Sequence, residues 1–346
     1  MFSKDNLVDK GFDTGQINQI LKFDEEGYKF INEITPSITA PNIRILRKIY
    51  KTKMFSEIVF INFIRKMNNG VDIGRYFDEN FRTIYTPFQL DVLFACQEYN
   101  LKNTPKNFER LKNPAFSPEQ MQVLMKAVIN NVENYKLYNS ELNSKSMELL
   151  LDAYKEGIND DVFYDPSFCT DQLSILIDAK KRGLDTTNIA NFNMSPSCMQ
   201  ILIDAESEGI DISEIASEYY NEQDLIILIK ALKNKLDIKY LLDVSFEEPQ
   251  RKEVYEGIKE NLDVSKYADS KYDDKQMHVI RKTLSEGYDV TPLLDESIPS
   301  EKMKIYLNAK RQDIDTSYVL SKNITIKEAE TIIELRKKGY KIENTI

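Results

Sequence analysis

Apolar and polar positions recur with a period of 26 residues through residues 114–346. Residues 192–216 show one period, and the position held by Met199 serves as the reference position of the repeat. The reference position recurs without an inserted or lost residue, as Met121, Met147, Leu173, Met199, Leu225, Arg251, Met277, Met303 and Ala329. A short fixed period, in which one unit cannot bury its own apolar face, is typical of a solenoid of stacked units.

Each repeat carries the pattern of a helix N-terminus just before its reference position. An apolar residue lies five positions before it, and a Gln or Glu often lies one position before it. Between them, most copies have a residue that caps helices: Ser117, Asn143, Ser195, Asn221, Asp273 or Thr325. This combination is a capping box behind a hydrophobic staple, and it predicts that a helix begins there.

The rest of the repeat predicts where this helix ends and which element comes next. Apolar residues come two to four positions after the reference position, a small residue comes six after it, and Gly or Asn comes ten after it. Gly and Asn accept the left-handed conformation that ends helices. A pair such as Ile210-Asp211 then predicts a capped second helix of one turn, α or 3₁₀. The predicted fold is therefore an all-α solenoid whose repeat is a three-turn helix plus a one-turn helix.

The repeat divides the chain into two predicted parts. Residues 114–346 form a regular array of nine repeats, whereas residues 1–113 hold divergent, irregular helical repeats. Residues 41–113 break the 26-residue phase, so we interpret residues 1–113 as an N-terminal cap and a possible interaction region. One regular copy is weak, because Arg251 and Glu253 occupy positions that are apolar elsewhere, and this predicts looser packing at residues 246–260.

Two segments resemble a known kind of repeat protein. Residues 266–290 read KYADSKYDDKQMHVIRKTLSEGYDV, and residues 116–128 read FSPEQMQVLMKAV. They resemble the uncharacterised short helical-repeat proteins of Gram-positive gut bacteria and their mobile elements, which repeat Gln-Met, a helix, Gly-Leu-Asp-Val-Ser and Tyr-Ala. The chain is also similar in kind to leucine-rich-variant solenoids. The resemblance covers about residues 114–346 and implies a fold but no catalytic residues.

Charge is distributed unevenly along the chain, whose formal net charge is −10. Residues 41–113 hold 13 basic and 7 acidic residues, whereas residues 114–346 hold 29 basic and 42 acidic residues. The basic segment includes a predicted helix with candidate binding residues Arg44, Arg47, Lys48, Lys51 and Lys53. Such a face could bind an acidic protein or a nucleic-acid backbone. The alternative is a solvated outer face of a capping helix.

An acidic column is the second candidate surface. Asp152, Asp178 and Asp204 lie five positions after the reference position in three consecutive repeats. The column could bind a basic peptide, but Lys155 and Lys181 lie where they could pair with the first two on the helix surface. We predict no metal site, because adjacent helices stand about 8–10 Å apart.

The sequence contains no catalytic constellation. Cys96, Cys169 and Cys198 lack metal-type spacing, and the only histidine, His278, has no partner motif. Phosphate-binding loops, His-Glu-x-x-His and nucleophile elbows are absent. We therefore predict that the protein is not an enzyme and needs no cofactor. Acidic residues at the start of the chain, and the lack of a long apolar run, predict a cytoplasmic protein without a membrane partner.

These observations favour a non-catalytic helical-repeat scaffold that binds another macromolecule, with a protein as the leading partner. Two alternatives stay open. The chain could be a mobile-element or phage inhibitor whose acidic array mimics nucleic acid and blocks a host nuclease. It could also bind nucleic acid through residues 41–113. The pattern leaves the oligomeric state open.

Overall fold

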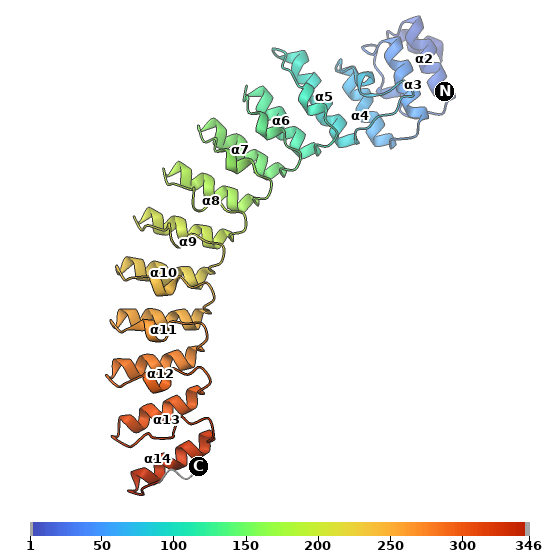
Figure 1. The fold of residues 1–346 in the computed structure, drawn as a ribbon. Coiled ribbons are helices and arrows are strands. Elements are labelled where there is room, and N and C mark those ends of the chain that lie inside the picture. Colours follow the sequence, from blue (N-terminus) through green and yellow to red (C-terminus); the bar gives the residue numbers. More distant parts are fainter. Residues whose placement is uncertain (1–2, 343–346) are drawn as a thin grey trace. The chain divides into compact units, whose positions relative to one another are not determined.

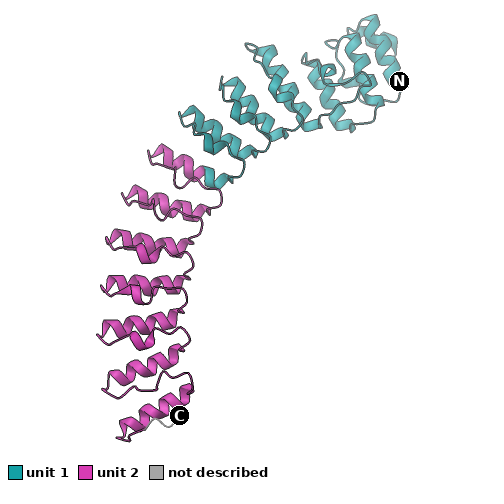
Figure 2. Cartoon of the chain, in the orientation of Figure 1, with its two compact units in different colours: residues 1–173 teal, residues 174–346 magenta. Residues whose placement is uncertain are grey.

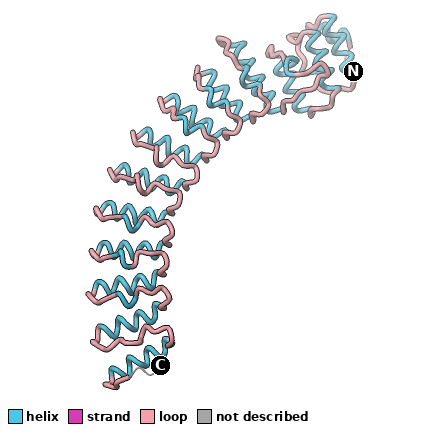
Figure 3. The backbone as a smooth tube through the Cα atoms, in the orientation of Figure 1, coloured by secondary structure: helices cyan, strands magenta, loops and turns pink. Residues whose placement is uncertain are grey.

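A computed structural model describes residues 3–342, which form helices, turns and no strand (Figures 1 and 3). The helices are α1 Lys4–Asp9, α2 Thr14–Glu25, α3 Ala40–Lys51, α4 Glu57–Asn68, α5 Pro87–Lys102, α6 Pro118–Ile129, α7 Ser144–Lys155, α8 Thr170–Lys181, α9 Pro196–Ser207, α10 Glu222–Lys233, α11 Glu248–Lys259, α12 Asp274–Ser285, α13 Ser300–Lys310 and α14 Ile326–Lys337. The 3₁₀ helices are η1 Ile31–Glu33, η2 Ile73–Tyr76, η3 Glu109–Lys112, η4 Tyr135–Tyr138, η5 Asp161–Tyr164, η6 Lys239–Leu241, η7 Val264–Lys266 and η8 Thr291–Leu293.

The chain divides into two compact units, residues 1–173 and residues 174–346 (Figure 2). In the first unit, α2 packs on α3, α5 on α6 and α6 on α7. In the second unit, each helix from α9 to α14 packs on the next one in the chain. This serial packing confirms the predicted all-α solenoid. The division falls inside α8, whereas the change of repeat phase at residue 113 lies within the first unit.

Helices begin where the sequence predicts them to begin. In α6, the Ser117 backbone N–H donates to Gln120 Oε1 at 2.6 Å, and the Gln120 N–H donates to Ser117 Oγ at 3.2 Å. The same reciprocal pair caps α12, through Asp273 and Gln276. It also caps α2 and α5 in the irregular part of the chain. The capping rule therefore extends to helices that the 26-residue period does not reach.

The predicted C-terminal positions also adopt the expected backbone. Gly209 has a φ of 82°, and Asn131 has a φ of 57°. Lys235 and Asp313 take the same left-handed conformation in the two copies without Gly or Asn, with φ of 55° and 56°. The second element of the repeat is a 3₁₀ helix in η4 to η8, and a turn in the other regular copies.

The glutamine of the capping box has a second role, which the sequence analysis missed. Gln276 Nε2 donates to the carbonyl oxygens of Glu296 and Ile298 in the next repeat, at 2.9 and 2.8 Å. Equivalent amides make the same two bonds, 20 and 22 residues ahead, at Gln16, Gln120 and Gln250. We call this double hydrogen bond the inter-repeat staple. It supplies a donor to two carbonyl groups at the contact between neighbouring repeats, which we call the joint. Without a donor, burying these carbonyl groups would cost free energy.

The weak copy is not loosely packed, so that expectation is wrong. Arg251 is only 1% exposed. Its Nε lies 3.0 Å from Asp224 Oδ1, and its Nη atoms donate to the carbonyls of Leu241, Asp243 and Phe246 at 2.9, 3.1 and 3.4 Å. Asp224 stands where other repeats have the staple glutamine, and a carboxylate cannot donate. Arg251 supplies the missing donor to Phe246, so the pair replaces the staple bond to the residue 22 positions ahead.

Glu253, the other polar residue of this copy, is anchored as well. Its Oε2 accepts a hydrogen bond from Arg281 Nε at 2.8 Å, and its Oε1 lies 3.1 Å from His278 Nδ1. Arg281 also donates to Glu260 Oε1 at 2.7 Å, and its side chain is 7% exposed. Glu253 therefore ties α11 to α12, as Arg251 ties α11 to α10.

The small residue six positions after the reference position lets neighbouring elements approach, and Gly257 is the strictest case. A Cβ atom on Gly257 would lie 2.0 Å from Tyr267 Oη and 2.9 Å from Val264 Cγ1. Tyr267 is fully buried and donates to the Glu253 carbonyl at 3.1 Å. Even alanine, which most other repeats carry here, does not fit.

We expect Gly257→Ala to lower the free energy of unfolding by about 1–3 kcal/mol, because the buried Tyr267 ring has to move. In an open helix interior the same change would stabilise by about 0.5–1 kcal/mol. Adding Tyr267→Phe removes the atom in closest conflict and should recover part of the loss. Urea unfolding followed by circular dichroism measures both variants, and a stabilising Gly257→Ala would contradict the close approach.

Candidate functional site

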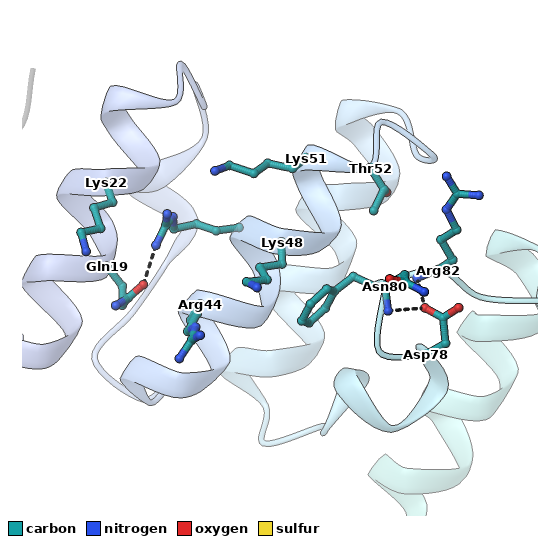
Figure 4. A pocket seen from close by; sticks show the side chains of 11 residues that line it. Gln19, Lys22, Arg44, Lys48, Lys51, Thr52, Asp78, Asn80 and Arg82 are labelled. Carbon is teal, nitrogen blue, oxygen red and sulfur yellow. Dashed lines mark hydrogen bonds between the residues drawn. The ribbon is translucent and has the colours of Figure 1, made fainter.

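A groove of about 1030 Å³ lies in the first unit, between α2, α3 and the turn at residues 78–82 (Figure 4). Most of its charged side chains are basic. The lining residues are Gln19, Lys22, Arg44, Arg47, Lys48, Lys51, Thr52, Asp78, Asn80, Phe81 and Arg82. The groove therefore includes four of the five residues of the predicted basic face.

The groove lies where the repeat rule fails. Residues 52–56 join α3 directly to α4, without the 3₁₀ helix or the turn that forms the second element of a regular repeat. Ile43 and Phe60, which lie four residues after the N-caps of α3 and α4, are thus only 17 residues apart. The connection between η2 and α5 is long by comparison, and its 78–82 turn supplies one wall of the groove. The break in phase therefore creates the concave surface.

The 78–82 turn is held by the Asp78 carboxylate. Asp78 Oδ1 accepts from the backbone N–H groups of Asn80 and Arg82, at 2.9 and 2.8 Å. Phe81 adopts a φ of 59°, a left-handed conformation that is unusual for a bulky residue. Its ring lies 5.0 Å from the Lys48 ammonium. The turn thus places Phe81 and Arg82 at the groove. Its backbone N–H groups also hydrogen-bond the Asp78 carboxylate, which lines the same wall.

Arg47 and Lys51 are paired within the protein. Arg47 Nη2 and Nε contact the two carboxylate oxygens of Glu26 at 2.6 and 3.2 Å, and Nη1 donates to Gln19 Oε1 at 2.6 Å. Lys51 Nζ lies 2.8 Å from the same carboxylate. The hydrogen bond from Arg47 is the main reason that the pKa of Glu26 is lowered. Arg47 therefore holds α3 on α2.

The same tie recurs in the second unit. Arg281 contacts residues 28 and 21 positions earlier, Glu253 and Glu260, as Arg47 contacts Gln19 and Glu26. Both arginines lie four positions after their reference positions, Ile43 for Arg47 and Met277 for Arg281. This parallel supports a structural role for Arg47.

Four cations of the groove have no ion pair among the residues that the structure describes: Lys22, Arg44, Lys48 and Arg82. All four are exposed, and they come from α2, α3 and the 78–82 turn. Lys53 does not line the groove, and its ammonium lies 3.8 Å from the Tyr50 ring. Of the five predicted residues, Arg44 and Lys48 thus remain available to a partner.

Lys22 and Arg82 were not among the predicted binding residues. Lys22 could have been found, because it lies five positions after Ile17, as Lys48 lies five after Ile43. Arg82 carried no comparable signal, since the placement of its turn against α3 cannot be deduced from the period.

The residues of the acidic column also lie five positions after their reference positions, but each has a partner within its own repeat. Asp152 pairs with Lys155 at 3.0 Å, Asp178 lies 3.8 Å from Arg182, and Asp204 accepts from Gln200 at 2.8 Å. Asp152 belongs to the first unit, and the other two aspartates belong to the second. Among the described residues, no group of three His, Cys, Asp or Glu side chains could hold a metal ion.

The remaining candidate groups lie apart from the groove. Cys96 and Cys198 are buried, and Cys169 is exposed. Burial raises the pKa of the Cys96 thiol to about 12, which disfavours the reactive thiolate. His278 contacts Glu253 on the surface of the second unit.

The fold defines the class of this protein as an all-α solenoid of short helical repeats. Comparison with protein-family models, with curated proteins and with solved structures finds no match to the chain. The resemblance to the repeat proteins of Gram-positive gut bacteria therefore stays a prediction. Between residues 3 and 342, no helix combines the length and apolar character needed to cross a membrane.

Charge reversal should destabilise the protein more at Arg47, which is ion-paired, than at Arg44 and Lys48, which have no ion pair in the part of the chain that the structure describes. We expect Arg47→Glu to lower the free energy of unfolding by about 1–3 kcal/mol, because it sets a carboxylate against the half-buried Glu26 and Gln19. Arg44→Glu with Lys48→Glu should cost at most about 0.5 kcal/mol per residue, because both side chains are exposed. Urea titration tests the contrast, and equal losses would show that Arg47 is not a structural tie.

Proposed function

We propose that this chain is a non-catalytic helical-repeat scaffold that binds an acidic segment of another protein in the groove between α2, α3 and the 78–82 turn. The observation that carries the proposal is the set of four unpaired cations, Lys22, Arg44, Lys48 and Arg82, around one concave surface. Neighbouring cations at the same wall are paired with Glu26. The free cations are thus a separate set, open to an external anion.

The charge around the groove favours a short acidic segment over a long nucleic acid. The first unit, residues 1–173, holds 21 basic and 24 acidic residues, a net charge of −3. A nucleic-acid backbone gains affinity from many phosphate contacts along its length. Beyond the groove it would meet a surface that is acidic on balance. A segment of a few residues can place its carboxylates within the groove alone.

Fluorescence anisotropy with a labelled Glu-rich peptide and the full chain tests this proposal. We expect the peptide to bind, and Arg44→Glu with Lys48→Glu to weaken it by at least about tenfold, or 1.4 kcal/mol. Lys252→Glu with Lys304→Glu is the matched control. It makes the same change of net charge at exposed positions, one residue after their reference positions, as Arg44 is.

Two outcomes would replace the proposal. A labelled single-stranded oligonucleotide that binds more tightly than the peptide, and loses affinity in the groove variant, would support nucleic-acid binding through residues 41–113. Equal binding of the peptide to the groove variant and the control would exclude the groove. If a basic probe then bound the wild-type chain and lost binding on reversal of Asp152, Asp178 and Asp204 to Lys, the inhibitor hypothesis would take its place.

A further inference from the structure

We infer that the anionic group for which the groove is built is a phosphoryl group on the partner segment, so that the scaffold reads phosphorylation of its partner. This inference rests on the proposed function and narrows it. It commits to a phosphorylated protein segment as the occupant. The reasons are the placement of Lys22, Arg44 and Lys48 on two packed helices and the excess of cations over carboxylates in the groove.

Three of the four cations lie on two packed helices. Lys22 and Lys48 hold the same repeat position in α2 and α3, which pack on each other. Packed helices stand about 8–10 Å apart, so two long side chains at matching positions can reach one anion. Arg44 lies one turn before Lys48 on the same side of α3, about 6 Å away between Cβ atoms. All three line the groove opposite Arg82 (Figure 4).

Cations outnumber carboxylates in the groove, where Asp78 is the one carboxylate among the described lining residues. Glu26 is engaged by Arg47 and Lys51, and Asp78 is engaged by the N–H groups of its own turn. Asp78 keeps its single negative charge on the turn beside Arg82, so Lys22, Arg44 and Lys48 on the opposite helices repel one another until an anion binds. A ligand with a larger negative charge relieves more of that repulsion than a singly charged ligand does.

A phosphoryl group fits this arrangement better than a single carboxylate does. A phosphomonoester carries a charge of about −1.5 to −2 at neutral pH and has three acceptor oxygens. It can accept from several donors on different elements at once, whereas a carboxylate has two oxygens and one charge. An arginine such as Arg44 can also bind two phosphate oxygens through its planar fork.

The turn makes the site rigid on one side. The Asp78 carboxylate and the backbone bond between the Asp78 N–H and the Arg82 carbonyl, at 2.8 Å, close the turn. Lys48 lies over the Phe81 ring, so its ammonium is held near the groove. Preorganised donors lose less conformational entropy when an anion binds.

Three labelled peptide pools, identical except for a central Ser, Glu or phosphoserine, test the inference by anisotropy on the full chain. Randomised flanking residues remove the dependence on one sequence context. We expect the phosphoserine pool to bind at least about tenfold more tightly than the Glu pool. Arg44→Glu with Lys48→Glu should abolish this difference, and Lys252→Glu with Lys304→Glu should preserve it.

Each other result has a defined meaning. Equal affinity of the phosphoserine and Glu pools, both above the Ser pool, overturns the phosphoryl inference and leaves the acidic-segment function standing. Equal affinity of all three pools overturns both. A phosphoserine preference that survives in the groove variant places the phosphate elsewhere on the chain. A single-stranded oligonucleotide that outcompetes the phosphoserine pool assigns the groove to nucleic acid.

Discussion

Replacing Arg251 by Met is expected to lower the free energy of unfolding by about 3–5 kcal/mol, although Met is the residue found at several other reference positions. The Asp224 side chain is 5% exposed, and Arg251 supplies its ion pair. Without Arg251 the carboxylate is a buried charge with no cation beside it. The Phe246 carbonyl loses its donor as well.

The partner change should reverse most of this loss. Asp224→Gln with Arg251→Met recreates the standard joint, because the new amide can donate to Phe246, 22 residues ahead, as Gln276 donates to Ile298. Urea unfolding of the two single variants and the double variant forms a double-mutant cycle, and we expect a coupling energy of at least about 2 kcal/mol. Additive losses would show that the two substitutions are independent.

Amide hydrogen exchange measures the local stability of the contact between α10 and α11. In the wild-type chain, we expect the amides of α11 to be protected like those of α12, since the Arg251 bonds close this joint. Arg251→Met should reduce protection there first, because local openings occur at the weakest packed seam. Low protection of α11 in the wild-type chain would restore the expectation of a loose copy.

Replacing Gln276 by Glu should cost about 3 kcal/mol, even though it changes one atom and keeps the helix cap. Glu328 shows that Glu can cap a helix at this position, because its carboxylate accepts from the Thr325 N–H at 2.6 Å. A carboxylate cannot donate to the carbonyls of Glu296 and Ile298. The variant therefore removes the inter-repeat staple while leaving the capping box in place.

Gln276→Lys is the complementary variant, because it keeps a donor to the next repeat and loses only the acceptor of the Asp273 N–H. The chain already uses a lysine at this position, where Pro299 at the cap has no N–H. Lys302 Nζ donates to the Ser321 carbonyl at 2.7 Å and to the Ile324 carbonyl. We expect Gln276→Lys to stay within about 1 kcal/mol of wild type, since the donor is kept. Comparable destabilisation by Glu and Lys, measured by urea titration, would mean that donation to the next repeat contributes little.

The three joints explain how the repeat tolerates variation before its reference position. The carbonyl 22 residues after the position that precedes the reference receives a donor in each case: an amide at Gln276, an ammonium at Lys302 or a guanidinium at Arg251. What the joint requires is a donor, and its residue type can vary. At Asp224, where the glutamine donor is absent, Arg251 restores one.

Local sequence patterns were sufficient to predict where helices begin and end and how they repeat. Capping boxes such as Ser117 with Gln120 join residues three positions apart, and the left-handed φ of Gly209 depends on its own backbone. Both are local effects, so a single chain displays them directly. The unbroken period of 26 then predicted a stack of like units, because each unit leaves an apolar face to be covered.

Contacts across the stack decide which polar residues serve it and which remain free. Arg47 and Lys48 are neighbours on one helix, yet Arg47 is tied to Glu26 and Lys48 faces the groove. Arg251 predicted a weak repeat, whereas the fold places Asp224 beside it. These outcomes depend on contacts between residues 20 to 28 positions apart, and on a turn that reaches α3 from beyond α4. The pattern of apolar positions records which faces are buried, but not which polar groups meet across a joint.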